Sequence, residues 1–268
     1  HEGGAIPYRF FLAPYRVISD TYGVFVYDPD AGFARGFAPS LEFSFHGWRN
    51  GIMVMKHKDG TMYSTLSGRA YAGPRKGDQL QAIPTITTDW GYWNDAYPNS
   101  VAYRMFEKYQ PVELAVVENA DAVRSRGPVD KRLASHEQVI GVSHGGKTRA
   151  YRLTDLEQAG GLIRDRVGDQ PIVVLWYAPS RTAAVYTTDV VGMTAAGKNS
   201  KRQVTMTVES DGSFVDLETK SRWGIEGRAV DGSLRGHTLR WVDSVQCRWF
   251  AWAAEYPNTQ IYDRKKRQ

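Results

Sequence analysis

The chain has 268 residues, of which 42% are hydrophobic and 24% are charged, and its formal net charge is +5. This composition is typical of a folded globular protein and excludes a wholly disordered chain. The single cysteine, Cys247, excludes an internal disulfide and a cysteine-rich zinc site. No apolar stretch reaches the roughly 18 residues that span a bilayer, so we expect no transmembrane segment. The chain begins with His1 and shows no signal peptide, so we expect a processed or trimmed chain.

The positive charge is concentrated at the end of the chain. Residues 1–115 contain 11 basic and 11 acidic residues, whereas the terminal segment DRKKRQ (263–268) alone carries a charge of +3. A basic tail raises the isoelectric point without creating a binding face, so we do not expect nucleic-acid binding. The tail suits an acidic partner or peripheral contact with an anionic membrane.

In chain order, most of the sequence consists of short strand-like segments. Apolar or alternating runs lie at 41–47 and 51–57, and turn signals such as KDGT and GPRKGD follow them. Further strand-like runs lie at 171–177, 183–188 and 202–218. Short strands with one modest helix in each half predict a mainly β, α+β fold built from antiparallel sheets.

A short helix is predicted at the aromatic segment DWGYWNDAYPNS (89–100). Trp90, Trp93 and Tyr97 are spaced as one helix face, the residue pair before Trp90 can cap its start, and the following proline ends it. The segment RWFAWAAEYPNT (248–259) repeats this pattern. We expect both aromatic faces to pack in a core rather than to stack on carbohydrate.

The two aromatic segments belong to a longer internal repeat. When the chain is shifted by 159 residues, 12 of the 36 pairs between 68–103 and 227–262 are identical. Weaker matches extend the unit, so we predict two homologous, pseudo-twofold-related repeats. The first repeat is expected at 1–115, trimmed at its N-terminus, and the second at 137–268 with the basic tail. The polar segment 116–136 is expected to be a linker.

The segment GVSHGGKT (141–148) matches the phosphate-loop pattern letter for letter and also contains the nucleophile-elbow pattern G-x-S-x-G. Both motifs require a helix directly after the loop. The following letters TRAYRL read as a strand, so we predict a hairpin turn at SHGGK. We therefore expect neither ATP binding nor serine-hydrolase chemistry there.

Several polar residues are candidates for a site. Asp28 and Asp30 could form an acid/base or hard-cation pair with His46, although DPDAG also reads as a simple turn. The other candidate metal ligands are His1, whose free amino group and imidazole could chelate copper, and His144.

Three arginines are candidates for a ligand site or an interface. Arg69 and Arg228 occupy the paired GRA positions of the repeat, and this duplication favours a structural role. Arg181 lies in the segment YAPSRT (177–182) of the second repeat. We predict no cofactor.

The stretch TMYSTLSGRAYAGPRKGDQLQAIPTITTDWGYWNDAYPNS (61–100) resembles the core of the bacterial domain of unknown function 3179 family. Members of that family carry a similar W-S-x-L-T-G-x-A-x-x-G-P run, followed by T-T-W-G-E-W and an H-P-D-T ending. The letters VIGVSHGGKTRAYRL (139–153) resemble the segment before that core. Over both copies the resemblance extends to most of the chain.

The resemblance also implies a Tyr-Cys-Pro-Leu-Cys-Gly segment, the family's candidate for reactive or metal-binding chemistry. The matching positions here read YDPDAG (27–32) and YAPSRT (177–182), so both copies are degenerate and lack the cysteines. A thiolate nucleophile or thiolate–metal site cannot operate there. The resemblance further implies an extracytoplasmic protein, periplasmic or secreted.

We therefore expect a non-catalytic exported binding module or accessory subunit of a larger assembly, with other protein subunits as partners. The alternative is a metal-binding protein or enzyme that uses Asp28, Asp30 and His46. The two hypotheses differ in whether these carboxylates face a pocket beside His46 or only close a turn.

Overall fold

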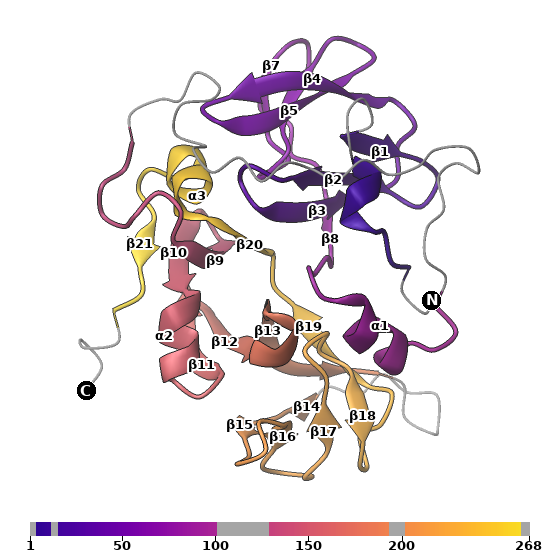
Figure 1. The fold of residues 1–268 in the computed structure, drawn as a ribbon, viewed down its shortest axis with the longest axis vertical. Coiled ribbons are helices and arrows are strands. Elements are labelled where there is room, and N and C mark those ends of the chain that lie inside the picture. The colour runs from indigo at the N-terminus through magenta and orange to yellow at the C-terminus, as the bar shows by residue number, and fades with distance from the viewer. Residues whose placement is uncertain (1–3, 12–15, 101–128, 193–201, 264–268) are drawn as a thin grey trace. The chain divides into compact units, whose positions relative to one another are not determined.

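The computed structural model describes residues 4–11, 16–100, 129–192 and 202–263. The protein is mainly β, with several antiparallel sheets and few helices, as expected from the sequence (Figure 1). The chain divides into two compact units, which are described separately. Unit 1 contains His1–Thr85, Asp89–Glu137 and Cys247–Pro257; unit 2 contains Ile86–Thr88, Gln138–Gln246 and Asn258–Gln268.

Unit 1 is built on two four-stranded antiparallel sheets. In spatial order, the first sheet contains β1 (Val17–Ser19), β2 (Val24–Asp28), β3 (Phe33–Phe37) and β8 (Ala82–Ile83). The second contains β4 (Phe43–Arg49), β5 (Ile52–His57), β6 (Met62–Ser64) and β7 (Ala70–Ala72). The helical elements are η1 (Tyr8–Phe11), α1 (Trp90–Ala96) and α3 (Trp249–Glu255). The strand expectations at 41–47 and 51–57 are confirmed by β4 and β5.

Unit 2 is also built from sheets. One has the order β11 (Leu162–Val167), β12 (Gln170–Tyr177), β13 (Thr182–Val191), β14 (Arg202–Gln203), with β19 (Thr238–Trp241) also paired to β13. Another has the order β20 (Ser244–Arg248), β9 (Gln138–His144), β10 (Lys147–Arg152), β21 (Gln260–Ile261). A meander contains β15 (Met206–Val208), β16 (Phe214–Asp216), β17 (Arg222–Trp223) and β18 (Ala229–Asp231). One pairing, β10 with β21, is parallel. The short helical elements are α2 (Leu153–Gln158) and η3 (Ala178–Ser180).

The glycine-rich segment 141–148 forms the predicted hairpin. Lys147 and Thr148 pair with His144 and Ser143 as the first residues of β10, so a strand follows the turn where a phosphate loop needs a helix. The expectation of one helix in each half is wrong in one respect, because α2 follows β10. Its six residues are too few to show a helical period, but Leu153 and Leu156 on it are buried.

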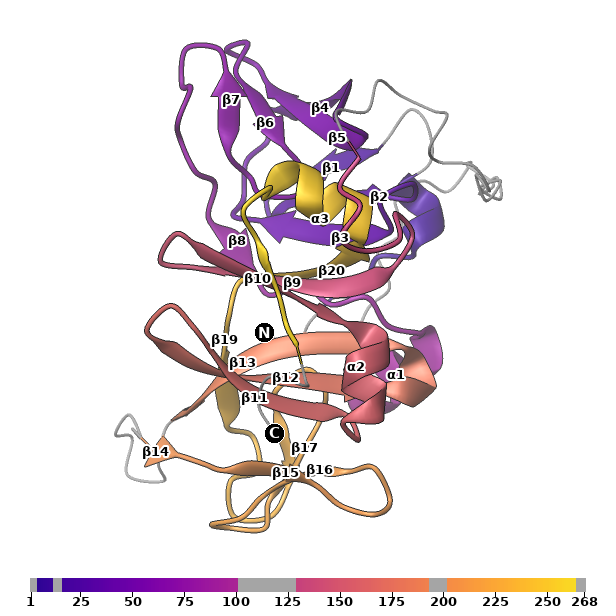
Figure 2. The same ribbon diagram turned by 90° about the vertical axis from the view of Figure 1, so that its left-hand side faces the viewer.

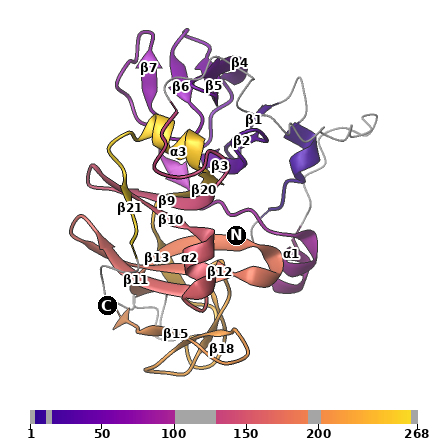
Figure 3. The same cartoon turned by 60° about the vertical axis from the view of Figure 1, so that its left-hand side comes forward.

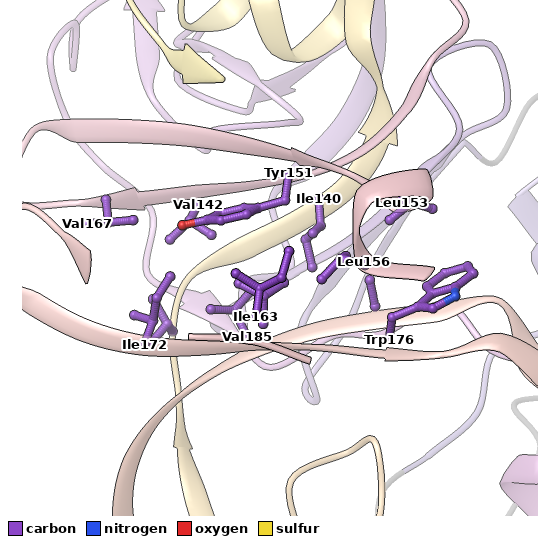
Figure 4. Close-up of a cluster of buried hydrophobic side chains, with 13 residues drawn as sticks. Ile140, Val142, Tyr151, Leu153, Leu156, Ile163, Val167, Ile172, Trp176 and Val185 are labelled. Atoms are coloured by element: carbon purple, nitrogen blue, oxygen red, sulfur yellow. The ribbon is translucent and has the colours of Figure 1, made fainter. Parts of the chain in front are cut away.

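The core of unit 2 lies between the β9–β10 and β11–β12 hairpins (Figure 4). Alternate side chains of these strands point inward, as expected when one face of each hairpin is buried. Figure 4 shows Leu153 and Leu156 of α2 beside Trp176 of β12, so the helix covers one end of this core. Burial of each such side chain contributes about 1.5–3 kcal/mol to stability.

Both aromatic helices form where the sequence predicts them. Asp89 caps α1 by accepting the N–H of Tyr92 at 2.8 Å, and α3 ends at Glu255 with Tyr256 as its C-cap, directly before a proline. Core packing is confirmed for α3, in which Trp249 is 0% exposed. It is wrong for α1, which buries none of its residues and leaves Trp90 51% exposed.

The contacts of α3 place it in unit 1, beside β3 (Figures 2 and 3), although the sequence places it in the second repeat. The two units are groups of residues in contact, whereas the repeats are stretches of similar sequence. The units therefore do not test the repeat boundaries, and 1–115 and 137–268 stay a prediction. Most of the expected linker, 116–136, lies outside the described residues. Its last part, from residue 129, belongs to unit 1.

Two hairpins at positions 159 residues apart share their backbone bonds. In the first, the Ala70 N–H donates to Asp78 O at 2.8 Å, and in the second the Ala229 N–H donates to His237 O at 2.8 Å. The glycines at the start of each hairpin tip, Gly73 and Gly232, have φ of 95° and 86°, which favours glycine at both places. Throughout the described part of the chain, no helix is both long and apolar enough to cross a membrane.

Candidate functional site

The turn between β2 and β3 carries the residues that the sequence singles out. Oδ1 of Asp28 accepts the N–H groups of Asp30 and Ala31, each at 3.1 Å, which is the behaviour that makes aspartate a turn residue. Oδ2 of Asp28 accepts the N–H of Met53 in β5 at 2.9 Å. Asp28 is 0% exposed. Its carboxylate therefore closes the turn and joins it to the second sheet of unit 1.

The three members of the expected acid/histidine site have different surroundings. Asp28 and Asp30 are both buried in the turn, whereas His46 is exposed on β4. Among the described residues, no three histidine, cysteine or acidic side chains gather in a way that could hold a metal ion. The turn thus brings Asp28 and Asp30 together without including His46 in such a group.

Cys247 and Arg35 lie near the same turn and were not predicted to do so. Both side chains are buried, and the charges of Arg35 and Asp28 both act on the Cys247 thiol. Burial raises the pKa of this thiol well above its usual range, and the N–H of Trp252 and the Arg35 charge lower it by less. The single thiol is therefore held protonated, which does not suit a nucleophile or a metal ligand.

The start of α3 is bonded to the turn. The N–H of Arg248 donates to Ala31 O at 2.8 Å, and Nη1 of Arg248 donates to Asp30 O at 2.9 Å. At the other end of the helix, the hydroxyl of Ser67 donates to the carboxylate of Glu255. These contacts fix α3 against the strands of unit 1. No local sequence signal could predict them, because Asp30 and Arg248 are 218 positions apart.

The candidate arginines lie in separate places. Arg69 is exposed and Arg228 half-buried, and their backbones form matching bridges with Gln79 and Thr238. Arg181 is exposed in a left-handed backbone conformation with φ of 51°. Arg69 belongs to unit 1, whereas Arg181 and Arg228 belong to two different turns of unit 2.

The remaining metal candidates are also separate. His1 lies outside the described residues. His144, at the end of β9, has Nε2 3.5 Å from Oδ1 of Asp169, whose side chain is almost fully exposed. A pair this open to water contributes little to stability.

The second sheet of unit 1 contains a charged network that was not expected from the sequence. Nε2 of the buried His57 lies 2.6 Å from Oε2 of Glu42, and its Nδ1 lies 3.0 Å from Oδ1 of Asp59. The second Asp59 oxygen lies 2.8 Å from Nε of Arg75. Hydrogen bonds from Thr61, and then the neighbouring His57, hold the pKa of Asp59 well below its usual range. The network joins the loop before β4, the β5–β6 turn and the tip after β7.

These observations define a mainly β protein in which a buried aspartate closes the turn between β2 and β3. Residues 25–259 match the family described as Protein of unknown function (DUF3179), and because this match covers most of the chain, the protein belongs to that family. No curated protein and no solved structure matches the chain.

Proposed function

We propose that this protein is a non-catalytic, exported binding module or accessory subunit of a larger protein assembly. The observation that carries the proposal is a pair of exposed apolar side chains on neighbouring loops of unit 1. Tyr22 is 77% exposed and Leu41 is 68% exposed. Their loops are joined by a hydrogen bond from the Ser19 hydroxyl to Ser40 O. Tyrosine and large apolar side chains held in place on a surface are typical of protein interfaces.

The test is a native mass spectrum of the protein isolated from its source without chelators or denaturant. Partner chains retained with the protein, and lost from a Tyr22→Ser, Leu41→Ser double variant, are the expected result. A matched double variant at exposed positions of unit 2, Leu217→Ser with Val230→Ser, should keep the partner. An isolated monomer with no retained chain would refute the proposal.

The alternative is a metal-binding protein or an enzyme that uses the two carboxylates of the turn. Asp28 stands at the first cysteine position of the family resemblance and Asp30 lies between the two cysteine positions, and this location favours the alternative. A bare chain that carries a metal adduct in the same spectrum, lost in an Asp30→Asn variant, would support it. Asp30 is the better position to change, because Asp28 also closes the turn.

We further propose an extracytoplasmic location, tested by fractionation of the source cells. Peripheral membrane contact through the basic tail belongs to the same proposal, although residues 264–268 lie outside the described residues. A vesicle-flotation assay with anionic and neutral lipids tests it. Flotation with anionic lipids that is unchanged after neutral substitution of 264–267 would contradict a role for the tail.

The two repeats expected from the sequence are the last part of the proposal. The matched hairpins support a duplication. The helix of the second copy, α3, has its contacts in unit 1, so the sequence repeats and the compact units have different boundaries. Amide exchange tests this. Trp252→Ala should speed exchange in β2 and β3 and leave β11 and β12 unchanged.

A further inference from the structure

Two tyrosines and one arginine lie at the turn between β2 and β3 in unit 1. The hydrogen bonds within the protein do not use all the N–H donors of this arginine. Tyr27, at the end of β2, is half-buried, and its ring centroid lies 5.7 Å from that of Tyr8. Tyr8 is 61% exposed. Arg248 is bonded to the same turn, and its charge acts on the Tyr27 hydroxyl. Chain segments that are far apart in sequence therefore bring two phenols and a cation to this turn.

Arg248 is held in place by its stem and by one of its donors. A Cβ on Gly32 would lie 3.6 Å from Cγ and 3.7 Å from Nε of Arg248, so this side chain runs across the glycine. Nη1 donates to Asp30 O at 2.9 Å. A guanidinium has five N–H donors. Among the described residues, the bond to Asp30 O is the one that the Arg248 guanidinium makes. A half-buried guanidinium with one carbonyl acceptor has donors left for an anion.

We propose that Arg248, Tyr27 and Tyr8 form a binding site for a carboxylate. The planar fork of an arginine matches the two oxygens of a carboxylate, which a lysine cannot do. The Tyr27 hydroxyl supplies one more donor, and the exposed Tyr8 ring flanks the bound group. This inference rests on the proposed binding function and names the chemistry that unit 1 recognises.

The charges around the turn favour a carboxylate over a phosphate. Asp28 and Asp30 lie in the same turn, so a dianion meets more repulsion than a monoanion. Burial, more than any neighbouring charge, raises the pKa of Tyr27, so its hydroxyl keeps its proton and can donate it. The backbone N–H groups around Asp28 are engaged by its own carboxylate and do not compete for the ligand.

The test is an NMR titration of the full chain with benzoate, followed through the Arg248 Nε–H and the Tyr8 and Tyr27 ring signals. We expect saturable shifts at these three residues. Arg248→Gln should weaken binding at least about tenfold, and Tyr27→Phe about three- to tenfold, as for loss of a charged and of a neutral hydrogen bond. Arg235→Gln, at an exposed hairpin tip of unit 2, is the matched control and should bind within about twofold of the parent protein.

Arg248→Lys keeps the charge and stem but loses the fork, so it tests the site even if Arg248→Gln does not fold. It should bind benzoate more weakly than the parent protein. Absence of saturable shifts, or parent-like binding by both Tyr27→Phe and Arg248→Lys, would overturn the inference. Replacing benzoate by the peptide acetyl-Gly-Glu-Gly-amide distinguishes the source: tighter peptide binding assigns the carboxylate to a partner protein, and tighter benzoate binding assigns it to a free acid.

The two proposals fail separately. Partner chains retained by a protein that binds no carboxylate would refute this site alone. Carboxylate binding by a protein that retains no partner would refute the accessory-subunit function and leave the site intact.

Discussion

Replacing Asp28 by alanine tests whether this residue is structural, as its bonding indicates. The change removes the acceptor of three buried N–H groups, those of Asp30, Ala31 and Met53. Each unsatisfied buried donor costs about 1–3 kcal/mol, so after partial relaxation we expect a loss of about 3–6 kcal/mol. This is a large part of the roughly 5–15 kcal/mol that stabilises a typical domain.

Urea unfolding followed by tryptophan fluorescence measures this loss. With a slope of about 2 kcal/mol per molar, the midpoint should fall by about 1.5–3 M. Amide exchange at Met53 should rise with it and locate the loss in unit 1. Asp169→Ala, at an aspartate that is exposed in a turn of unit 2, should change the midpoint by less than about 0.3 M. A parent-like midpoint for Asp28→Ala would refute the structural role of this residue. Its carboxylate would then again be a candidate catalytic or metal-binding group.

Three further predictions follow from burial and charge. Trp249→Ala should cost about 3–5 kcal/mol because its indole is fully buried, whereas Trp90→Ala at the matching position should cost less than about 1 kcal/mol; thermal unfolding compares them. The lowered pKa of Asp59, caused first by hydrogen bonds from Thr61, means that its stabilising contribution is present above the unfolded pKa of about 4 and is lost as the pH falls below it. Asp59→Asn should therefore melt with a weaker dependence on pH in this acidic range, and an unchanged dependence would contradict the network. Burial raises the pKa of Cys247, so iodoacetamide at about pH 8 should leave the native thiol unmodified and alkylate it in concentrated guanidinium chloride.

Local features were predictable because their causes are local. The spacing of Trp90, Trp93 and Tyr97, with Asp89 before them and a proline after them, defines α1 within ten residues. The glycine pair after His144 likewise defines a hairpin. The exposure of α1 was not predictable, because burial depends on what packs against a helix.

The composition of the candidate site depends on long-range contacts. Arg248 and Cys247 meet a turn more than 200 positions earlier in the chain, and a single sequence carries no signal for such a pairing. His57 was visible as one of six scattered histidines, and Asp59 is only two residues from it, but Glu42 approaches it only after β4 and β5 have paired. The sequence offered an acid/base pair and a simple turn as alternatives for Asp28 and Asp30, and the bonding of Asp28 to the backbone fits the turn.

The grouping of α3 with unit 1 also determines when this unit can be completed. Arg248 and the helix that follows it reach the β2–β3 turn only after almost the whole chain has been synthesised. Until then, the surface that they cover stays exposed, and contacts of such sequence separation are slow to form. We therefore expect the first unit to mature late, after synthesis instead of during it. A chain that terminates before residue 247 should be a substrate for chaperones and proteases even though the strands of both sheets of unit 1 are present in it.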